Sequence, residues 1–138
     1  MSKTEYFYTA SYVFERARGR VMDTYELNSI AEAGLDQRDP EDIRSEIEEQ
    51  LTSGNLNADE RSTACFALGK TLDSSLVPLF QQQLRLELKA KSSAVYQLLI
   101  CLSDLDENVF GVDRDGSFSA MDVELNLRDA EAYLGDKV

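Results

Sequence analysis

The sequence predicts an all-α protein with about seven helices, and three observations support this class. Apolar residues recur at three- and four-residue spacing along most of the chain. Residues that cap helices stand before several of these apolar runs. Residues 62–72 partly match residues 92–102, and such self-similarity is typical of stacked helical repeats. We therefore expect one domain over residues 1–138, with antiparallel helices and a repeat-like core over residues 58–105.

The first two helices are predicted from an aromatic cluster and a capping pattern. Tyrosine and phenylalanine residues crowd residues 4–18 at spacings that suit one broad helical face, although a strand over residues 5–9 is an alternative because aromatic residues favour strands. Asp23 and Glu26 have the spacing of a capping box, and Gly34 can end the second helix in the left-handed conformation.

The third and fourth helices have clear start signals. Asp39 precedes Pro40, which suits the first position of a helix, and Gly54 follows the last apolar residue of that segment. Asn57 and Glu60 form a second capping-box pattern before the fourth helix.

Three further helices complete the prediction. The fifth covers residues 75–88, with Pro78 tolerated in its first turn, and the sixth runs over residues 93–103. The last, over about 119–134, is capped by Ser119 or Ser117. Its predicted inward-facing residues are Val123, Leu127, Ala130 and Leu134.

The composition narrows the possible functions. The net charge is −12, which disfavours binding to nucleic acid. The absence of histidine removes the commonest general base and metal ligand, so we expect no enzymatic activity, no cofactor and no metal. The chain contains neither an apolar run long enough for a membrane helix nor a signal peptide, which predicts a cytoplasmic protein that does not bind membranes. Cys65 and Cys101 fit apolar helical patterns and are expected in the core.

The acidic residues fall into two blocks. Residues 21–60 hold 12 acids and 2 bases, residues 104–138 hold 10 acids and 3 bases, and the rest of the chain is mildly basic. If the two blocks lie side by side, they form an anionic surface that suits a basic protein. The predicted partner-binding residues are Asp104, Asp106, Glu107, Asp113, Asp115, Glu46 and Glu49.

Residues 111–122 resemble the calcium-binding loop of an EF-hand. With Gly116 at the invariant glycine, Asp113, Asp115 and Asp122 take ligand positions. Gly111, however, stands where the first carboxylate is needed, and Asp122 replaces the usual glutamate. We therefore interpret this segment as a polar turn that serves recognition.

Residues 58–110 resemble HEAT-like helical repeats, in the residues Arg61, Ala64, Ala67, Leu68, Gly69 and Pro78. A helical repeat followed by ENVFGVDRDGSFS and DVELNLRDAEAYL looks like a bacterial immunity protein. This resemblance implies a cytoplasmic antitoxin that binds and blocks one cognate toxin domain, of the kind delivered in contact-dependent growth inhibition.

Two functions from different classes follow. The first is an inhibitor that covers a basic toxin domain with its acidic surface, and for a nuclease toxin the carboxylates would occupy the phosphate-binding groove. The alternative is a general helical-repeat adaptor that docks through an apolar groove. An enzyme would have to use paired carboxylates around residues 104–107, in a deep pocket.

Overall fold

The computed structural model describes residues 1–135 and confirms the all-α prediction. These residues form seven α-helices and one 3₁₀ turn, and no strand occurs among them. None of the helices in this range has the length and apolar character required to cross a membrane. The chain divides into two compact units, with the boundary between Thr71 and Leu72. That boundary lies inside the predicted repeat-like segment.

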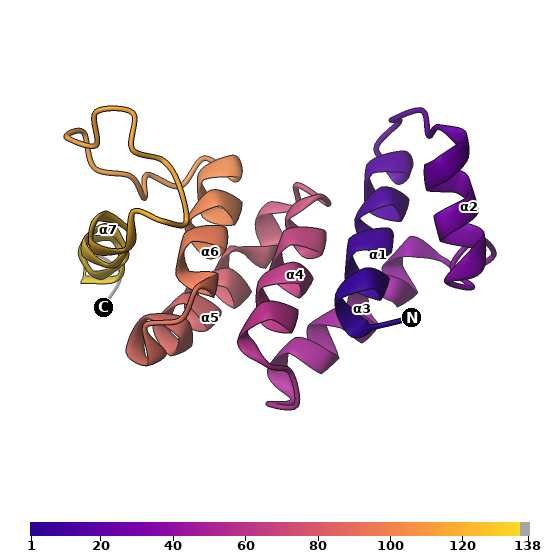
Figure 1. Ribbon diagram of the computed structural model, residues 1–138, viewed down its shortest axis with the longest axis horizontal. Coiled ribbons are helices and arrows are strands. Elements are labelled where there is room, and N and C mark those ends of the chain that lie inside the picture. Colours follow the sequence, from indigo (N-terminus) through magenta and orange to yellow (C-terminus); the bar gives the residue numbers. More distant parts are fainter. Residues whose placement is uncertain (136–138) are drawn as a thin grey trace. The chain divides into compact units, whose positions relative to one another are not determined.

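The first unit contains α1 (Lys3–Ala17), α2 (Thr24–Glu32), α3 (Pro40–Thr52) and α4 (Ala58–Gly69). Helix α1 lies between α2 and α4 (Figure 1) and packs most extensively against α4. Alanines on both helices are fully buried and allow this close approach. The core of this unit includes Phe7, Ala10, Val13, Phe14, Ile30, Leu35, Ile43, Ile47, Leu51, Ala64 and Leu68.

Local side-chain hydrogen bonds begin these helices where the sequence predicts. Asp23 and Asn57 both form complete capping boxes with the glutamates three residues later. The Asp39 carboxylate accepts the main-chain N–H of Glu41, with Pro40 at the first helical position. Residues 5–9 lie within α1, so the strand alternative is wrong.

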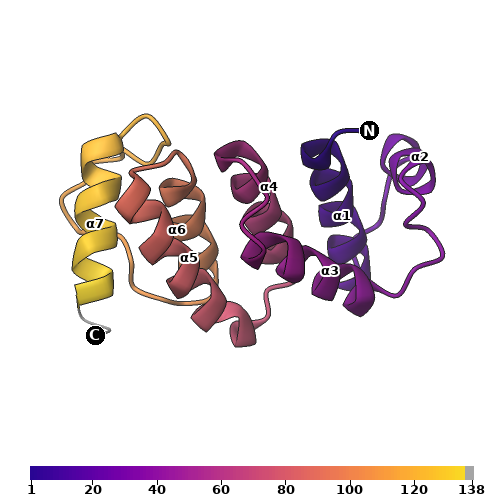
Figure 2. The same ribbon diagram turned by 90° about the horizontal axis from the view of Figure 1, so that it is seen from below.

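The second unit contains the 3₁₀ turn η1 (Ser74–Leu76), α5 (Val77–Ala90), α6 (Ala94–Asp104) and α7 (Val123–Gly135). Each of the three α-helices packs against the other two (Figure 2). The core includes Leu76, Phe80, Leu84, Ala94, Val95, Leu98, Leu99, Leu102, Ala130 and Leu134. Cys65 in the first unit and Cys101 in the second are both buried, as predicted.

The last helix begins later than predicted. Neither Ser117 nor Ser119 caps it, because α7 starts at Val123. The Ser119 hydroxyl instead accepts the main-chain N–H of Met121 at 3.0 Å, which forms a turn before the helix. Val123 was predicted to face the core, but it stands at the first helical position and is 54% exposed.

The two similar sequence segments become α4 and α6, and their equivalent residues are buried alike at most positions. Ala64 matches Ala94 and Leu68 matches Leu98, and all four are fully buried. The similarity ends at the last pair. Leu102 is buried within α6. The residue that corresponds to it, Leu72, lies beyond α4 with a φ of 47° and is 44% exposed.

The capping box of α4 predicts a measurable loss of stability for Asn57→Ala. The Asn57 side chain accepts the Glu60 N–H at 2.9 Å, and removal of such a cap costs about 0.5–2 kcal/mol. Urea unfolding followed by circular dichroism measures the loss. Asn55→Ala is the matched control, because Asn55 is exposed and outside any helix. Equal effects of the two substitutions would contradict the capping role.

Candidate protein-binding site

Residues 105–122 connect α6 to α7 (Figure 1) and hold most of the predicted contact residues. We call this segment the α6–α7 loop. Its only basic side chain, Arg114, is just 2% exposed and therefore points into the unit. A buried charge is costly unless it is paired and fully hydrogen-bonded, so the surroundings of Arg114 decide whether the loop has a fixed structure.

Every nitrogen of the Arg114 guanidinium has a hydrogen-bond acceptor. Nη1 donates to Asp129 Oδ2 at 2.8 Å, Nη2 donates to Asn126 Oδ1, and Nε donates to the Ser117 carbonyl at 3.0 Å. Asp129 and Asn126 both belong to α7, while Ser117 belongs to the loop itself. Arg114 thus ties the centre of the loop to the last helix.

Two aromatic rings from the same loop complete the surroundings of Arg114. Its guanidinium carbon lies 5.0 Å from the ring centroids of both Phe110 and Phe118. These rings meet edge to face, with centroids 5.3 Å apart. Cation–π contacts at such distances attract the guanidinium to the faces of the two rings. The loop therefore folds around its own cation.

Asp129 is the anionic partner in this arrangement and is only 4% exposed. Burial acts to raise the pKa of Asp129, but the Gly111 N–H, Arg114 and Arg128 outweigh burial and lower it below the ordinary value. A Cβ atom on Gly111 would lie 2.9 Å from Asp129 Oδ1 and 2.8 Å from Arg128 Nη2. A side chain at position 111 would therefore displace the Asp129 carboxylate or the Arg128 guanidinium.

Asp113, one of the predicted contact residues, is exposed but already paired. Its two carboxylate oxygens lie 2.9 and 3.0 Å from two nitrogens of Arg128 on α7. A bidentate pair of this kind fixes the orientation of both side chains. Asp113 therefore presents a carboxylate that is partly neutralised before any partner arrives.

Glu107, another predicted contact residue, also has an internal partner. The Tyr133 hydroxyl donates to Glu107 Oε1 at 2.6 Å, and the Gln81 amide donates to the same hydroxyl at 2.8 Å. Burial and the Glu107 hydrogen bond raise the pKa of Tyr133 to about 12, against an opposing contribution from Gln81. These contacts tie the beginning of the loop to α7 and α5.

Asp104, Asp106 and Asp115 are exposed carboxylates in this part of the second unit, like Asp113. None of the first three forms an ion pair with another residue in the range 1–135. Asp106 and Asp115 have φ angles of 65° and 52°, in the left-handed region that aspartate tolerates better than most residues. The tight turns that result hold both carboxylates out into solvent.

The remaining predicted contact residues, Glu46 and Glu49, lie on α3 of the first unit. Glu46 accepts hydrogen bonds from Tyr6 at 2.9 Å and Arg38 at 2.8 Å, and the Arg38 hydrogen bond is the main cause that lowers its pKa. Glu49 is exposed. Because these two residues belong to a different unit from the loop, the expected adjacency of the two acidic blocks stays a prediction.

The sequence reasoning missed the exposed apolar residues of the α6–α7 loop and the start of α7. Four of them, interspersed with the acids, are Val112, Phe118, Met121 and Val123. Beside them a groove of about 270 Å³ runs between the start of α6 and α7, with Tyr96, Val123 and Leu127 in its lining. These apolar residues are visible in the sequence and could have indicated a binding surface. The polar turn residues around them led to the interpretation of the segment as a polar turn.

The residues that resemble an EF-hand loop do not form a metal site in the described structure. No group of three or more cysteine, aspartate or glutamate side chains within residues 1–135 is arranged to hold a metal ion. Asp113 turns to Arg128, and the positive charge inside the loop is the Arg114 guanidinium. The glycine and aspartates of the motif thus serve turns and an internal ion pair.

Arg114→Met should lower the free energy of unfolding by about 3–5 kcal/mol, because it leaves Asp129 as a buried charge without its main cation. Arg128→Met is the matched control. Arg128 also pairs with Asp129, but its guanidinium is 42% exposed, so solvent screens this cation and its removal should cost less, on the order of 1 kcal/mol. Urea unfolding measures both losses. Equal losses would show that Arg114 is not the residue that holds the loop.

The raised pKa of Tyr133 predicts a loss of stability at high pH. A folded-state pKa of about 12, above the ordinary 10, gives stability that is fully present below pH 10 and lost as the pH rises through about 12. Tyr133→Phe should flatten the decline in unfolding free energy over this range. Tyr25→Phe, at an exposed tyrosine, should leave it unchanged. The same decline in all three proteins would refute the Tyr133–Glu107 hydrogen bond.

The α6–α7 loop thus exposes carboxylates and apolar side chains, while contacts with α7 hold it from within. Comparison of the chain with protein-family models, with curated proteins and with solved structures finds no match.

Proposed function

We propose that this chain is an immunity protein, which binds a basic toxin domain through its α6–α7 loop and blocks it. One observation carries the proposal: the loop presents exposed acids and exposed apolar residues while its only base is buried. The resemblance of residues 58–110 to helical repeats, and of the following segments to immunity proteins, supports the same function. The proposal needs no catalytic group.

The distribution of charge supports a basic partner. Arg114 is the only basic residue in the range 104–122, and it points inward. Asp104, Asp106 and Asp115 therefore face solvent without an exposed basic residue of this segment beside them. A surface with one sign of charge steers a partner of the opposite sign and raises the association rate at low salt. For a nuclease partner, these carboxylates would occupy the groove that otherwise holds phosphates.

The exposed apolar side chains supply what charge alone does not. Val112 is fully exposed, Met121 is 87% exposed and Phe118 is about half exposed. The centre of a protein interface is generally depleted in charge and enriched in aromatic residues and methionine, with a polar rim around it. In our proposal these three side chains meet an apolar patch of the toxin and the carboxylates surround them.

The internal fixation of the loop also favours tight binding. A mobile loop loses conformational entropy when it binds, whereas a loop already held in its bound shape avoids much of that cost. Arg114, Asp129 and the Glu107–Tyr133 hydrogen bond hold the α6–α7 loop in place. The same contacts that stabilise the unit thus prepare its binding surface.

The groove beside α7 favours a second candidate, a helical-repeat adaptor. Its lining of Tyr96, Val123 and Leu127 could accept an apolar segment of a partner without help from the carboxylates. Binding by an adaptor of this type would depend little on salt. Salt dependence therefore separates the two candidates.

The proposal predicts that the double variant Asp106→Lys/Asp115→Lys loses protection. The partner to test is a toxic C-terminal domain encoded beside the gene of this chain, which an immunity function requires. We expect wild type to restore growth of cells that express this domain, and to bind the purified domain with an association rate that falls steeply with salt. The variant should associate about tenfold more slowly at low salt.

Glu124→Lys/Glu131→Lys is the matched control, since both glutamates are exposed, belong to α7 and give the same change of net charge. An equal reduction by the control would show that net charge alone acts. Salt-independent binding that Val123→Ser in the groove weakens, while the lysine variant does not, would favour the adaptor. Absence of any binding to the adjacent toxic domain would refute the immunity function.

A further inference from the structure

A second surface of the molecule, wholly within the first unit, combines aromatic rings with carboxylates. It is a groove of about 430 Å³, lined by Met1, α1, α2 and one residue of α4. Tyr8, Tyr12 and Tyr25 contribute rings, and Glu5 and Glu32 contribute carboxylates. Its volume lies within the range of sites that take small ligands or single side chains of a partner.

Two of the three tyrosines, Tyr8 and Tyr12, form a row of rings with Phe66 of α4. Tyr8 stacks on Phe66 of α4, with centroids 5.4 Å apart and planes at 11°, and meets Tyr12 edge to face at 5.6 Å. Tyr8 is half exposed and Tyr25 is 72% exposed. The exposed ring faces are accessible to a ligand, and they carry the negative part of the ring quadrupole.

One cation of the chain already uses this row. Lys70 Nζ lies 4.8 Å from the centroid of the Phe66 ring, which is the ring that Tyr8 stacks on. The row thus binds an ammonium group at its Phe66 end. The groove itself begins at Tyr8 and continues past Tyr12 to Tyr25 on α2.

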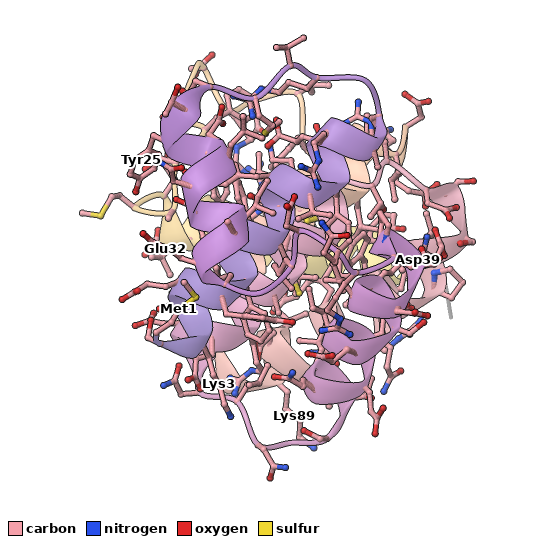
Figure 3. The ribbon with its side chains drawn as sticks, turned by 90° about the vertical axis from the view of Figure 1, so that its right-hand side faces the viewer. Met1, Lys3, Tyr25, Glu32, Asp39 and Lys89 are labelled. Carbon is pink, nitrogen blue, oxygen red and sulfur yellow. The ribbon has the colours of Figure 1, made fainter. Side chains whose placement is uncertain are left out.

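The charged groups of the groove favour the same kind of ligand. Among the side chains that line it, Glu5 and Glu32 are charged and exposed, and none is basic. The α-amino group of Met1 is the one cation among the lining residues. Tyr25, Glu32 and Met1 lie along the same side of the unit, as Figure 3 shows. Burial is the main cause that raises the pKa of Tyr12, and the neighbouring Glu26 and Asp23 contribute in the same direction.

From these observations we infer a cation-binding site in this groove that takes an arginine side chain of a partner protein, between the tyrosine rings and the two carboxylates. Arginine suits the site better than lysine, because a planar guanidinium stacks on a ring while it donates to a carboxylate. The site stands apart from the proposed function, since all its residues belong to the first unit and none belongs to the α6–α7 loop.

The test uses the full chain and two small probes of the same shape, N-acetyl-arginine amide and N-acetyl-citrulline amide, which lacks the charge. Amide chemical shifts are followed by NMR at physiological ionic strength, where screening weakens unspecific attraction to an acidic protein. We expect the arginine probe to shift residues of α1 and α2 around the groove and to bind at least threefold more tightly than the citrulline probe.

Two variants locate the site. Tyr25→Leu keeps an apolar side chain but removes the ring, and Glu32→Gln keeps the shape but removes the charge. Both residues are exposed, so the fold should persist. Each substitution should weaken the arginine probe about two- to fivefold, the range for an exposed cation–π or ion-pair contact. Glu49→Gln on α3 is the matched control and should leave the affinity unchanged.

Three results would overturn the inference. Equal binding of the citrulline probe would show that charge is not recognised. Equal weakening by Glu49→Gln and Glu32→Gln would show attraction to the net negative charge alone. Chemical-shift changes that avoid α1 and α2 would place the probe elsewhere.

Discussion

The buried pair of Arg114 and Asp129 is the constraint on which the second unit depends. Removal of a guanidinium and a carboxylate from water costs several kcal/mol for each, and good geometry with complete hydrogen bonding must offset this cost. The structure meets that condition with donors and acceptors from both the loop and α7, and with two rings over the cation. An eighteen-residue connection without regular secondary structure therefore has one defined conformation, although it buries few apolar side chains of its own.

The carboxylates of the chain differ in what they can offer a partner. Three of them already have internal hydrogen bonds. Glu46 is bonded to Tyr6 and Arg38, Glu107 to Tyr133, and Asp113 to Arg128. A partner that engages them must compete with these contacts or share them. Asp104, Asp106 and Asp115 have no such internal ion pair within residues 1–135, so their full charge acts on the approach of a partner. A count of acids in the sequence therefore overestimates the charge that the first group offers to a partner. Such a count also cannot distinguish the first group from the second.

The features that could be predicted from the sequence are those that local interactions determine, namely the helices and their caps. The caps at Asp23, Asp39 and Asn57 form between residues two or three apart, and the helical apolar spacing depends on the same short range.

The α6–α7 loop could not be predicted in this way. Burial of Arg114 depends on Asn126 and Asp129, twelve and fifteen residues later, and the motif around it imitates a calcium loop. Ser119 and Ser117 were plausible caps, but the turn at Met121 delays the helix to Val123. The aromatic residues of α1 were predicted to form a helical face, yet their spacing does not reveal that Tyr8 remains half exposed.

The internal repeat has a consequence for how the chain can open. One copy becomes α4, which packs against α1 and α3, and the other becomes α6, which packs against α5 and α7. The repeated sequence therefore lies on both sides of the unit boundary and gives each unit its own apolar nucleus. Proteins built from such segments can unfold in parts, with separate free energies of opening. Damage to the Leu68 copy should loosen the helices of the first unit, while the Leu98 copy preserves those of the second.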